Sequence, residues 1–149
     1  MRAVPPVDYV TREEYYGSVE RLRDEGFETC ADLTVVDYLD FEPERTLPSG
    51  LVGERFELVV SFLSVQRRER RRLRVQVPES DLSVSSIFQL YPGVEAMERE
   101  AYDMFGVIFE GHPDLSRILM PEGWEGHPLR KDYSVGRVPV QFKDVRSTR

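Results

Sequence analysis

The chain has 149 residues, of which 40% are hydrophobic and 32% charged, and its formal net charge is −7. This length and balance fit one globular domain with a modest core. The negative charge argues against nucleic acid as a partner, because phosphate binding needs a basic face. No window approaches about 18 consecutive apolar residues, so we expect no membrane-spanning helix. The N-terminus lacks the apolar core of a signal peptide, which predicts an intracellular protein that meets a membrane only through partners.

The cysteine and histidine content limits metal chemistry. Cys30 is the single cysteine, which excludes an internal disulfide and a cluster held by four thiolates of this chain. His112 and His127 are the two histidines, and with one cysteine they fall short of a zinc site unless carboxylates complete it. We therefore expect no metal or cluster in this chain, and because it has no phosphate-cradling glycine loop we also expect no flavin. We interpret Cys30 as a small buried hydrophobic residue.

The first third of the chain predicts a strand, a helix and a second strand. Residues 3–7 are typical of a short edge strand, because their two prolines donate no ladder hydrogen bond. Thr11 stands three residues before Glu14, the spacing of a capping box, and begins a helix that ends at Gly26. In the next predicted strand, alternate residues form one face that we expect to point into the core. These residues are Phe27, Thr29, Ala31, Leu33 and Val35.

A loop rich in proline and glycine over residues 42–53 precedes a predicted β-hairpin. Residues 56–63 indicate a strand buried on both faces for part of its length, and residues 73–77 indicate its return strand. An arginine-rich run, 66–74, lies between and partly within them, which allows a nucleic-acid or lipid-headgroup interpretation. We favour a solvated hairpin end whose charge protects an edge strand and can meet an acidic neighbour.

A helical turn near residues 85–90 precedes the last predicted helix, which begins after Pro92 and Gly93 and ends at Gly106 in a left-handed cap. Its apolar residues recur at helical spacing, which predicts that they join the core: Val94, Met97, Ala101, Met104 and Phe105.

The charges of this helix predict a compensating cation near its C-terminus. Glu95 and Arg99 form a favourable pair four residues apart, whereas Glu100 and Asp103 are like charges near the negative end of the helix dipole. Asp103 therefore needs a positive partner. We expect Arg130 or Lys131, with Arg117 as the alternative.

From Gly111 onward, prolines and glycines interrupt every regular element, yet six side chains are too apolar for a disordered linker: Leu115, Ile118, Leu119, Met120, Trp124 and Leu129. An irregular segment of this kind can lay apolar groups over a partner surface. We predict an α+β domain over residues 1–110, with a small antiparallel or mixed sheet packed with helices. An extended partner-binding strap follows over residues 111–149.

The run from Glu98 to Tyr133 contains an acidic helix, two Gly-His-Pro corners, the segment Arg-Ile-Leu-Met-Pro and a basic exit, Pro-Leu-Arg-Lys-Asp-Tyr. This order resembles closely the signature region of the C-type subunits, or 30 kDa subunit family, of respiratory complex I, the NADH:quinone oxidoreductase. The resemblance is strongest over residues 95–142. It implies partner-contact or structural roles for a set of characteristic positions: Glu98, Arg99, Glu100, Asp103, His112, Asp114, Arg117, Trp124, His127, Arg130, Lys131, Asp132 and Tyr133.

The resemblance also implies a function. A member of this family is expected to be an accessory subunit of the peripheral arm, at the cytoplasmic side of the cell membrane. It carries no redox centre, while flavin mononucleotide, iron–sulfur clusters and quinone lie in partner subunits. The implied partners are the quinone-pocket subunit (49 kDa or D type) and the adjacent cluster-bearing B-type subunit. Because the chain begins later than many relatives, we expect a smaller sheet. The chain also stops soon after Phe142, which leaves open how far the strap reaches.

Two alternatives remain open. Similar domains occur in membrane-bound hydrogenases and in ferredoxin-driven relatives of complex I, so an equivalent scaffold subunit of such a complex is the first. The second is an enzyme with an unrecognised site, although the chain shows no P-loop, no GxGxxG or GxSxG motif and no metal-ligand series. His127 and Asp132 could form a base with its orienting acid, but the neighbouring Pro128 favours a corner-forming histidine. We expect both histidines to close their turns or reach a partner carbonyl.

Overall fold

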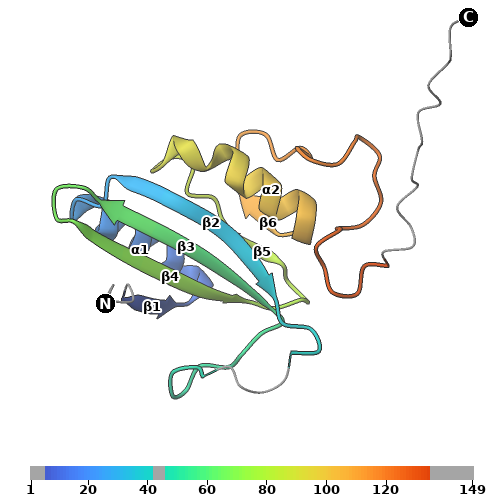
Figure 1. Cartoon of the computed structure of the whole chain (residues 1–149), viewed down its shortest axis with the longest axis horizontal. Helices are drawn as coiled ribbons and strands as arrows, with labels where there is room; N and C mark the ends of the chain where they lie inside the picture. Colours follow the sequence, from blue (N-terminus) through green and yellow to red (C-terminus); the bar gives the residue numbers. More distant parts are fainter. Residues whose placement is uncertain (1–5, 42–45, 135–149) are drawn as a thin grey trace, which may run out of the picture.

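The computed structural model describes residues 6–41 and 46–134, which form a four-stranded sheet, a two-stranded sheet and two α-helices (Figure 1). In chain order the elements are β1 Val7–Val10, α1 Arg12–Asp24, β2 Thr29–Asp37, β3 Phe56–Ser64, β4 Glu69–Val77, β5 Ser83–Ser85, a 3-10 turn at Pro92–Val94, α2 Glu95–Phe105 and β6 Ile108–Glu110. The predicted α+β class is confirmed.

The four-stranded sheet is mixed. Its order is β1-β4-β3-β2, with β2, β3 and β4 antiparallel and β1 parallel to β4. The predicted edge strand exists, but its bounds were wrong: it begins at Val7 and ends at Val10, and residues 1–5 lie outside the described part. Pro6 contributes its carbonyl alone, which accepts a hydrogen bond from the Arg72 amide at 3.0 Å, so the paired strand starts one residue later.

Helix α1 begins as the capping box predicts. The Thr11 hydroxyl accepts the Glu14 amide at 3.2 Å, and the Glu14 carboxylate accepts the Thr11 amide at 3.2 Å. Three apolar residues on one side of this helix, Tyr15, Val19 and Leu22, are buried. They pack in the same core as α2 and one face of the sheet.

A β-bulge in β2 overturns part of the predicted alternation. Cys30 pairs with Phe62 and Asp32 pairs with Ser61, so Ala31 is an extra residue that reverses the side-chain facing of the strand. Thr29 and Ala31 are therefore exposed instead of core-facing. Cys30 is half-buried against the core, and this burial raises the pKa of its thiol to about 12.

The hairpin of β3 and β4 is confirmed, with one correction. Phe56, Glu57 and Leu58 are buried in succession, as expected for a strand covered on both faces. Strand β4 begins at Glu69 and lies between β1 and β3, so its arginines sit in an interior strand. The prediction that they protect an edge strand was wrong for Arg72 and Arg74, because β1 pairs with residues 72–75. The predicted solvated hairpin end is present, since residues 65–70 are exposed.

Helix α2 ends at Gly106 in the predicted left-handed conformation, with φ of 83°. Its apolar residues join the core, with Met97 only partly buried. The turn at 87–90 is present, with the Leu90 and Tyr91 amides on the Ile87 carbonyl. Strands β5 and β6 were not predicted, because each has three residues, too few to show the alternation of apolar and polar residues that indicates a strand.

Candidate functional site

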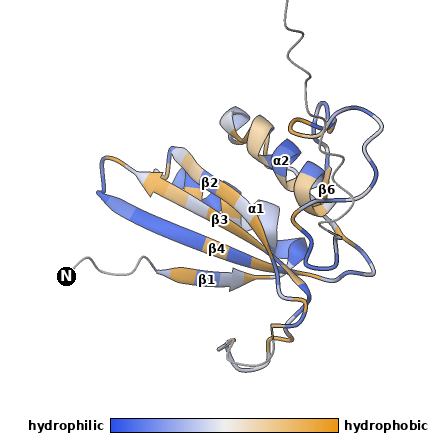
Figure 2. Ribbon diagram, turned by 45° about the vertical axis from the view of Figure 1, so that its right-hand side comes forward, coloured by the Kyte–Doolittle hydropathy of each residue, from blue (hydrophilic) through white to orange (hydrophobic). Residues whose placement is uncertain are grey.

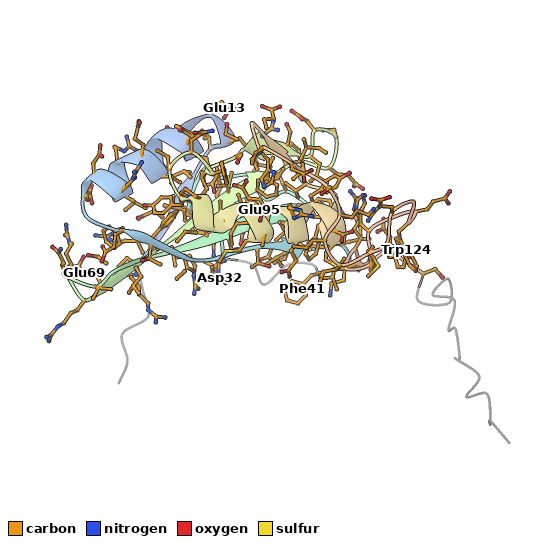
Figure 3. All side chains as sticks on the ribbon, turned by 90° about the horizontal axis from the view of Figure 1, so that it is seen from above. Glu13, Asp32, Phe41, Glu69, Glu95 and Trp124 are labelled. Carbon is orange, nitrogen blue, oxygen red and sulfur yellow. The ribbon has the colours of Figure 1, made fainter. Side chains whose placement is uncertain are left out.

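Residues 111–134, the described part of the strap, leave β6 and return across the C-terminal end of α2 (Figure 1). The structure describes them without a helix or strand, as predicted for a segment broken by proline and glycine. Figure 3 shows Trp124 on this segment, beyond the end of the helix. The residues of 135–149, including Gly136 and Pro139, lie outside the described part.

The strap caps the end of α2. The last carbonyls of a helix have no partner within the helix, and here the strap supplies donors to three of them. These pairs are Asp103 O with His127 Nδ1 at 3.0 Å, Met104 O with the Leu129 amide at 3.1 Å, and Phe105 O with Arg130 Nε at 2.6 Å. Because Nδ1 faces a carbonyl it carries the proton, and burial lowers the pKa of His127, which keeps the ring neutral.

The carboxylate of Asp103 is the centre of this junction. Its side chain is 0% exposed, and Arg117 Nη1 donates to Oδ1 at 2.6 Å. Three consecutive strap amides donate to Oδ2: Ile118 at 3.1 Å, Leu119 at 2.7 Å and Met120 at 2.8 Å. Burial pushes the pKa of Asp103 upward, but the Met120 amide, Arg117 and the other two amides together outweigh it and lower the pKa below its ordinary value.

The structure assigns the partner of Asp103 to Arg117, the predicted alternative, and the first choice of Arg130 or Lys131 was wrong. The chain turns back at residues 117–120 directly against the carboxylate. Arg130 instead caps Phe105 and lies 5.4 Å from the centre of the Phe56 ring. The Lys131 amide donates to Asp37.

Two glycines allow the strap to lie this close. A Cβ built on Gly106 would stand 2.6 Å from the Arg130 side chain and 2.7 Å from that of His127. A Cβ on Gly126 would stand 2.8 Å from the Tyr133 ring. The sequence predicted only a capping role for Gly106. The close approach of Arg130 and His127, which also requires glycine there, involves residues more than twenty positions away.

A second ionic cluster fastens the end of the strap to the sheet. Arg55, which is 10% exposed, binds Asp37 through two nitrogens at 3.0 Å and binds Asp132 at 2.8 Å. The hydrogen bonds that Arg55 donates to Asp37 and then to Asp132 raise the pKa of Arg55, and the bond from Arg55 lowers the pKa of Asp132. The Lys131 amide adds a contact to Asp37 at 2.9 Å. Asp37 and Arg55 were missed by sequence reasoning, because single charges next to a Pro/Gly loop are typical of exposed positions.

Glu98 lies five residues before Asp103 on α2 and is also 0% exposed. Its carboxylate accepts the Ser86 hydroxyl at 2.6 Å and the Ile87 amide at 2.9 Å, and His112 Nε2 stands at 3.9 Å. Burial raises the pKa of Glu98, and these neighbours oppose the rise without cancelling it. The carboxylate thus joins α2 to the loop after β5.

The first Gly-His-Pro corner is held by the imidazole of His112. Its Nδ1 accepts the Asp114 amide at 3.1 Å, so Nε2 carries the proton and donates to the Glu95 carbonyl at 3.1 Å. Arg99 fixes the adjacent residues, with Nη2 on the Ser116 hydroxyl at 3.0 Å and Nη1 on Glu95 at 3.0 Å. The predicted corner-forming role of both histidines fits these contacts.

Within the described part of the chain, the other candidate residues make no hydrogen bond or ion pair with the Asp103 carboxylate, and the proposed pair of His127 and Asp132 is not formed. Glu100 is exposed on α2, and the described residues give it no hydrogen bond or ion pair. Trp124 Nε1 is buried without a hydrogen-bond partner within 6–41 and 46–134. His127 and Asp132 are not joined as a base and its orienting acid, since the first binds Asp103 and the second binds Arg55.

The fold and this junction define the class as an α+β domain whose irregular C-terminal strap closes over its own last helix. A model of the family described as respiratory-chain NADH dehydrogenase, 30 Kd subunit, matches residues 9–138. The chain therefore belongs to that family, as the sequence resemblance predicted.

Named relatives agree. The chain is 46% identical over 138 residues to the C-type subunit of NADH-quinone oxidoreductase from Nocardioides sp. (93% of this chain, 48% of the relative), and 43% identical over 138 residues to that of Saccharopolyspora erythraea (91% and 51%). It is 41% identical over 141 residues to the Mycobacterium tuberculosis protein of the same name (93% and 56%). The chain spans about half the length of these relatives.

Two solved structures share the fold. A trypsin-resistant fragment of Nqo5 aligns with a TM-score of 0.65 and 33% identity, over 73% of this chain and 81% of that one. A chain of the membrane-bound sulfane sulfur reductase, an archaeal respiratory membrane complex, aligns with a TM-score of 0.65 and 20% identity, over 100% and 88%. Within the described residues, none of the helices is long and apolar enough to cross a membrane.

Proposed function

We propose that the chain is an accessory scaffold subunit in the peripheral arm of proton-translocating NADH:quinone oxidoreductase, and that its strap clamps the subunits of the quinone site. The observation that carries the proposal is the strap itself. Asp103, Asp37 and the carbonyls of α2 hold its backbone, and Arg55 binds its Asp132 side chain, while apolar side chains on it remain open to solvent. Exposed fractions are 40% for Ile118, 58% for Leu119 and 52% for Leu129.

This combination suits a clamp. A strap tied to its own domain loses little conformational entropy on binding, so its exposed apolar surface is available for association. Under this proposal the strap contacts the quinone-pocket subunit of the 49 kDa or D type and the neighbouring cluster-bearing B-type subunit. The chain itself lies peripherally at the cytoplasmic side of the cell membrane and reaches the membrane through these partners.

The proposal gives the chain no redox centre and no catalytic step of its own. The charged groups of the strap junction are committed to internal pairs, and among the described residues no group of three histidine, cysteine or acidic side chains gathers as metal ligands do. Flavin mononucleotide, iron–sulfur clusters and quinone belong to partner subunits in this account. Identities of 41–46% to subunits named for NADH-quinone oxidoreductase support this complex over a related hydrogenase-like one.

Affinity purification of the tagged full chain from its native membrane tests the proposal. We expect flavin, iron–sulfur clusters and the quinone-pocket subunit to be retained with it, and the separated chain to show no flavin band and no stoichiometric metal. The variant Leu119→Asp/Leu129→Asp should lose the retained subunits. Val52→Asp, which changes a 74% exposed side chain away from the strap, should keep them. Retention of all subunits by the strap variant would contradict the clamp.

A further inference from the structure

The side of the four-stranded sheet away from the helices carries a column of arginines. Leu73, Val75 and Val77 of β4 point into the core, so Arg70, Arg72 and Arg74 point to the opposite side. Figure 1 shows α1 behind the sheet and no helix in front of it, and Figure 2 shows β4 as a hydrophilic strip between the more apolar β3 and β1. In Figure 3 the labelled Asp32 lies on the far side of the sheet from α1.

The strand register sets apolar side chains beside these arginines. Arg70 pairs with Leu63 of β3, and Arg74 pairs with Val59 of β3 and with Tyr9 of β1. These three neighbours are half-buried although no helix covers them, as expected where arginine stems lie along apolar groups. We name this surface, formed by the three arginines with Leu63, Val59 and Tyr9, the arginine face.

The positive charge of the arginine face is only partly compensated within the chain. Arg74 pairs with buried Glu57 at 3.2 Å, and its Nε is buried without a hydrogen-bond partner in the described residues. Arg72 reaches only the Ser61 hydroxyl, at 3.4 Å, and the described residues supply neither Arg70 nor Arg72 with an ion pair. This positive surface stands on a chain whose formal net charge is −7.

We propose that the arginine face binds an extended acidic segment of a partner protein, with carboxylates at alternate positions. Alternate residues of a strand stand about 6.5–7 Å apart, so carboxylates with the same spacing meet successive guanidinium groups. Arginine binds a carboxylate through two parallel hydrogen bonds, and the flanking apolar side chains exclude water from those bonds. A protein segment fits better than nucleic acid or an anionic membrane, because the overall negative charge repels an extended polyanionic surface while one short segment meets the local positive field.

Binding of defined peptides to the purified full chain tests the spacing. The probe is a labelled peptide of alternating glutamate and valine, and the control peptide has the same composition with its glutamates in one block. We expect the alternating peptide to bind at low ionic strength and Arg70→Gln/Arg72→Gln to weaken it about tenfold, the loss typical of charge-assisted bidentate contacts. Arg23→Gln/Arg68→Gln removes the same charge from exposed positions elsewhere and should leave affinity within about threefold.

Other outcomes overturn the inference. Equal losses in both variants, or equal binding of the two peptides, would mean that net charge alone is recognised. Loss of phosphatidylserine-vesicle binding by Arg70→Gln/Arg72→Gln, with the peptide unbound, would assign the face to lipid. The peptide test uses the purified chain, so its failure leaves the proposed clamp untouched.

A photo-crosslinking residue at Ser61, in the middle of the arginine face, tests the same inference in the native membrane. The expected product joins this chain to a partner segment with carboxylates at alternate positions. A crosslink to a second copy, to lipid or to a segment without such carboxylates would contradict it, as would the absence of a crosslink.

Discussion

Two carboxylates five residues apart on α2 are both 0% exposed, and their pKa values move in opposite directions. Asp103 accepts three backbone amides and the Arg117 guanidinium, whereas Glu98 accepts one hydroxyl and one amide, and His112 Nε2 stands 3.9 Å away. Burial favours the neutral acid in both cases. The number and charge of the donors therefore decide which carboxylate stays ionised, and the strap supplies all four donors of Asp103.

The contrast separates two kinds of junction. At Asp103 the negative charge itself holds the strap against the helix end. At Glu98 a polar side chain joins α2 to the loop after β5, and the charge is a cost to folding. The following predictions test this difference, beginning with the largest effect.

The variant Asp103→Asn should lower the free energy of unfolding by about 2–4 kcal/mol, because it leaves Arg117 and at least one strap amide without the buried charge that they bind. Chemical denaturation of the full chain measures the change. Glu100→Gln, on the exposed side of the same helix, should stay within about 0.5 kcal/mol of the native chain. Similar losses for both variants would place the effect in the helix and not in the strap.

Gly106→Ala should lower stability by about 2–3 kcal/mol, because the new methyl group meets Arg130 and His127 in addition to the strain of a positive φ. Gly123→Ala is the matched control, since Gly123 has a φ of 80° and nothing within 4 Å of the added Cβ. It should show the strain alone, about 1 kcal/mol. Equal melting temperatures for the two variants would mean that the strap does not press on Gly106 in solution.

The pH dependence of stability should have opposite signs at the two acids. Asp103 has a lowered pKa, so its stabilisation is complete above its ordinary value of 3.8 and is lost as the pH falls through the folded-state pKa. Glu98 has a raised pKa, so its contribution is most favourable below 4.5 and declines as the pH rises through the folded-state value. The advantage of the native chain over Asp103→Asn should therefore shrink in acid.

The smallest change is expected for Glu98→Gln at neutral pH, within about 1 kcal/mol, because the amide keeps the shape and removes a charge that burial disfavours. Relative to the native chain, this variant should gain stability as the pH rises above 4.5. Urea titrations at several pH values give both profiles. If Glu98→Gln instead lost stability relative to the native chain as the pH rises, Glu98 would be stabilised in its ionised form by a group that this account does not include.

Elements with a strong local signal could be predicted from the sequence. The capping box of Thr11 and Glu14, the α2 stripe and the cap at Gly106 depend on neighbours within a few residues, and each is confirmed. Long-range pairings had no such signal. Arg117 was only the second choice for the cationic partner of Asp103, because no local pattern shows where the chain turns back toward that carboxylate. The bulge at Ala31 and the cluster of Asp37, Arg55 and Asp132 likewise arise from packing between distant segments.

The most direct test of the central claim, that Asp103 holds the strap and takes no part in chemistry, is quinone reductase activity per assembled complex in Asp103→Asn cells. We expect less assembled complex and a total activity that falls in proportion, with turnover of each intact complex nearly unchanged. Normal amounts of complex with a collapsed turnover would give Asp103 a part in proton or quinone chemistry and would contradict the scaffold account.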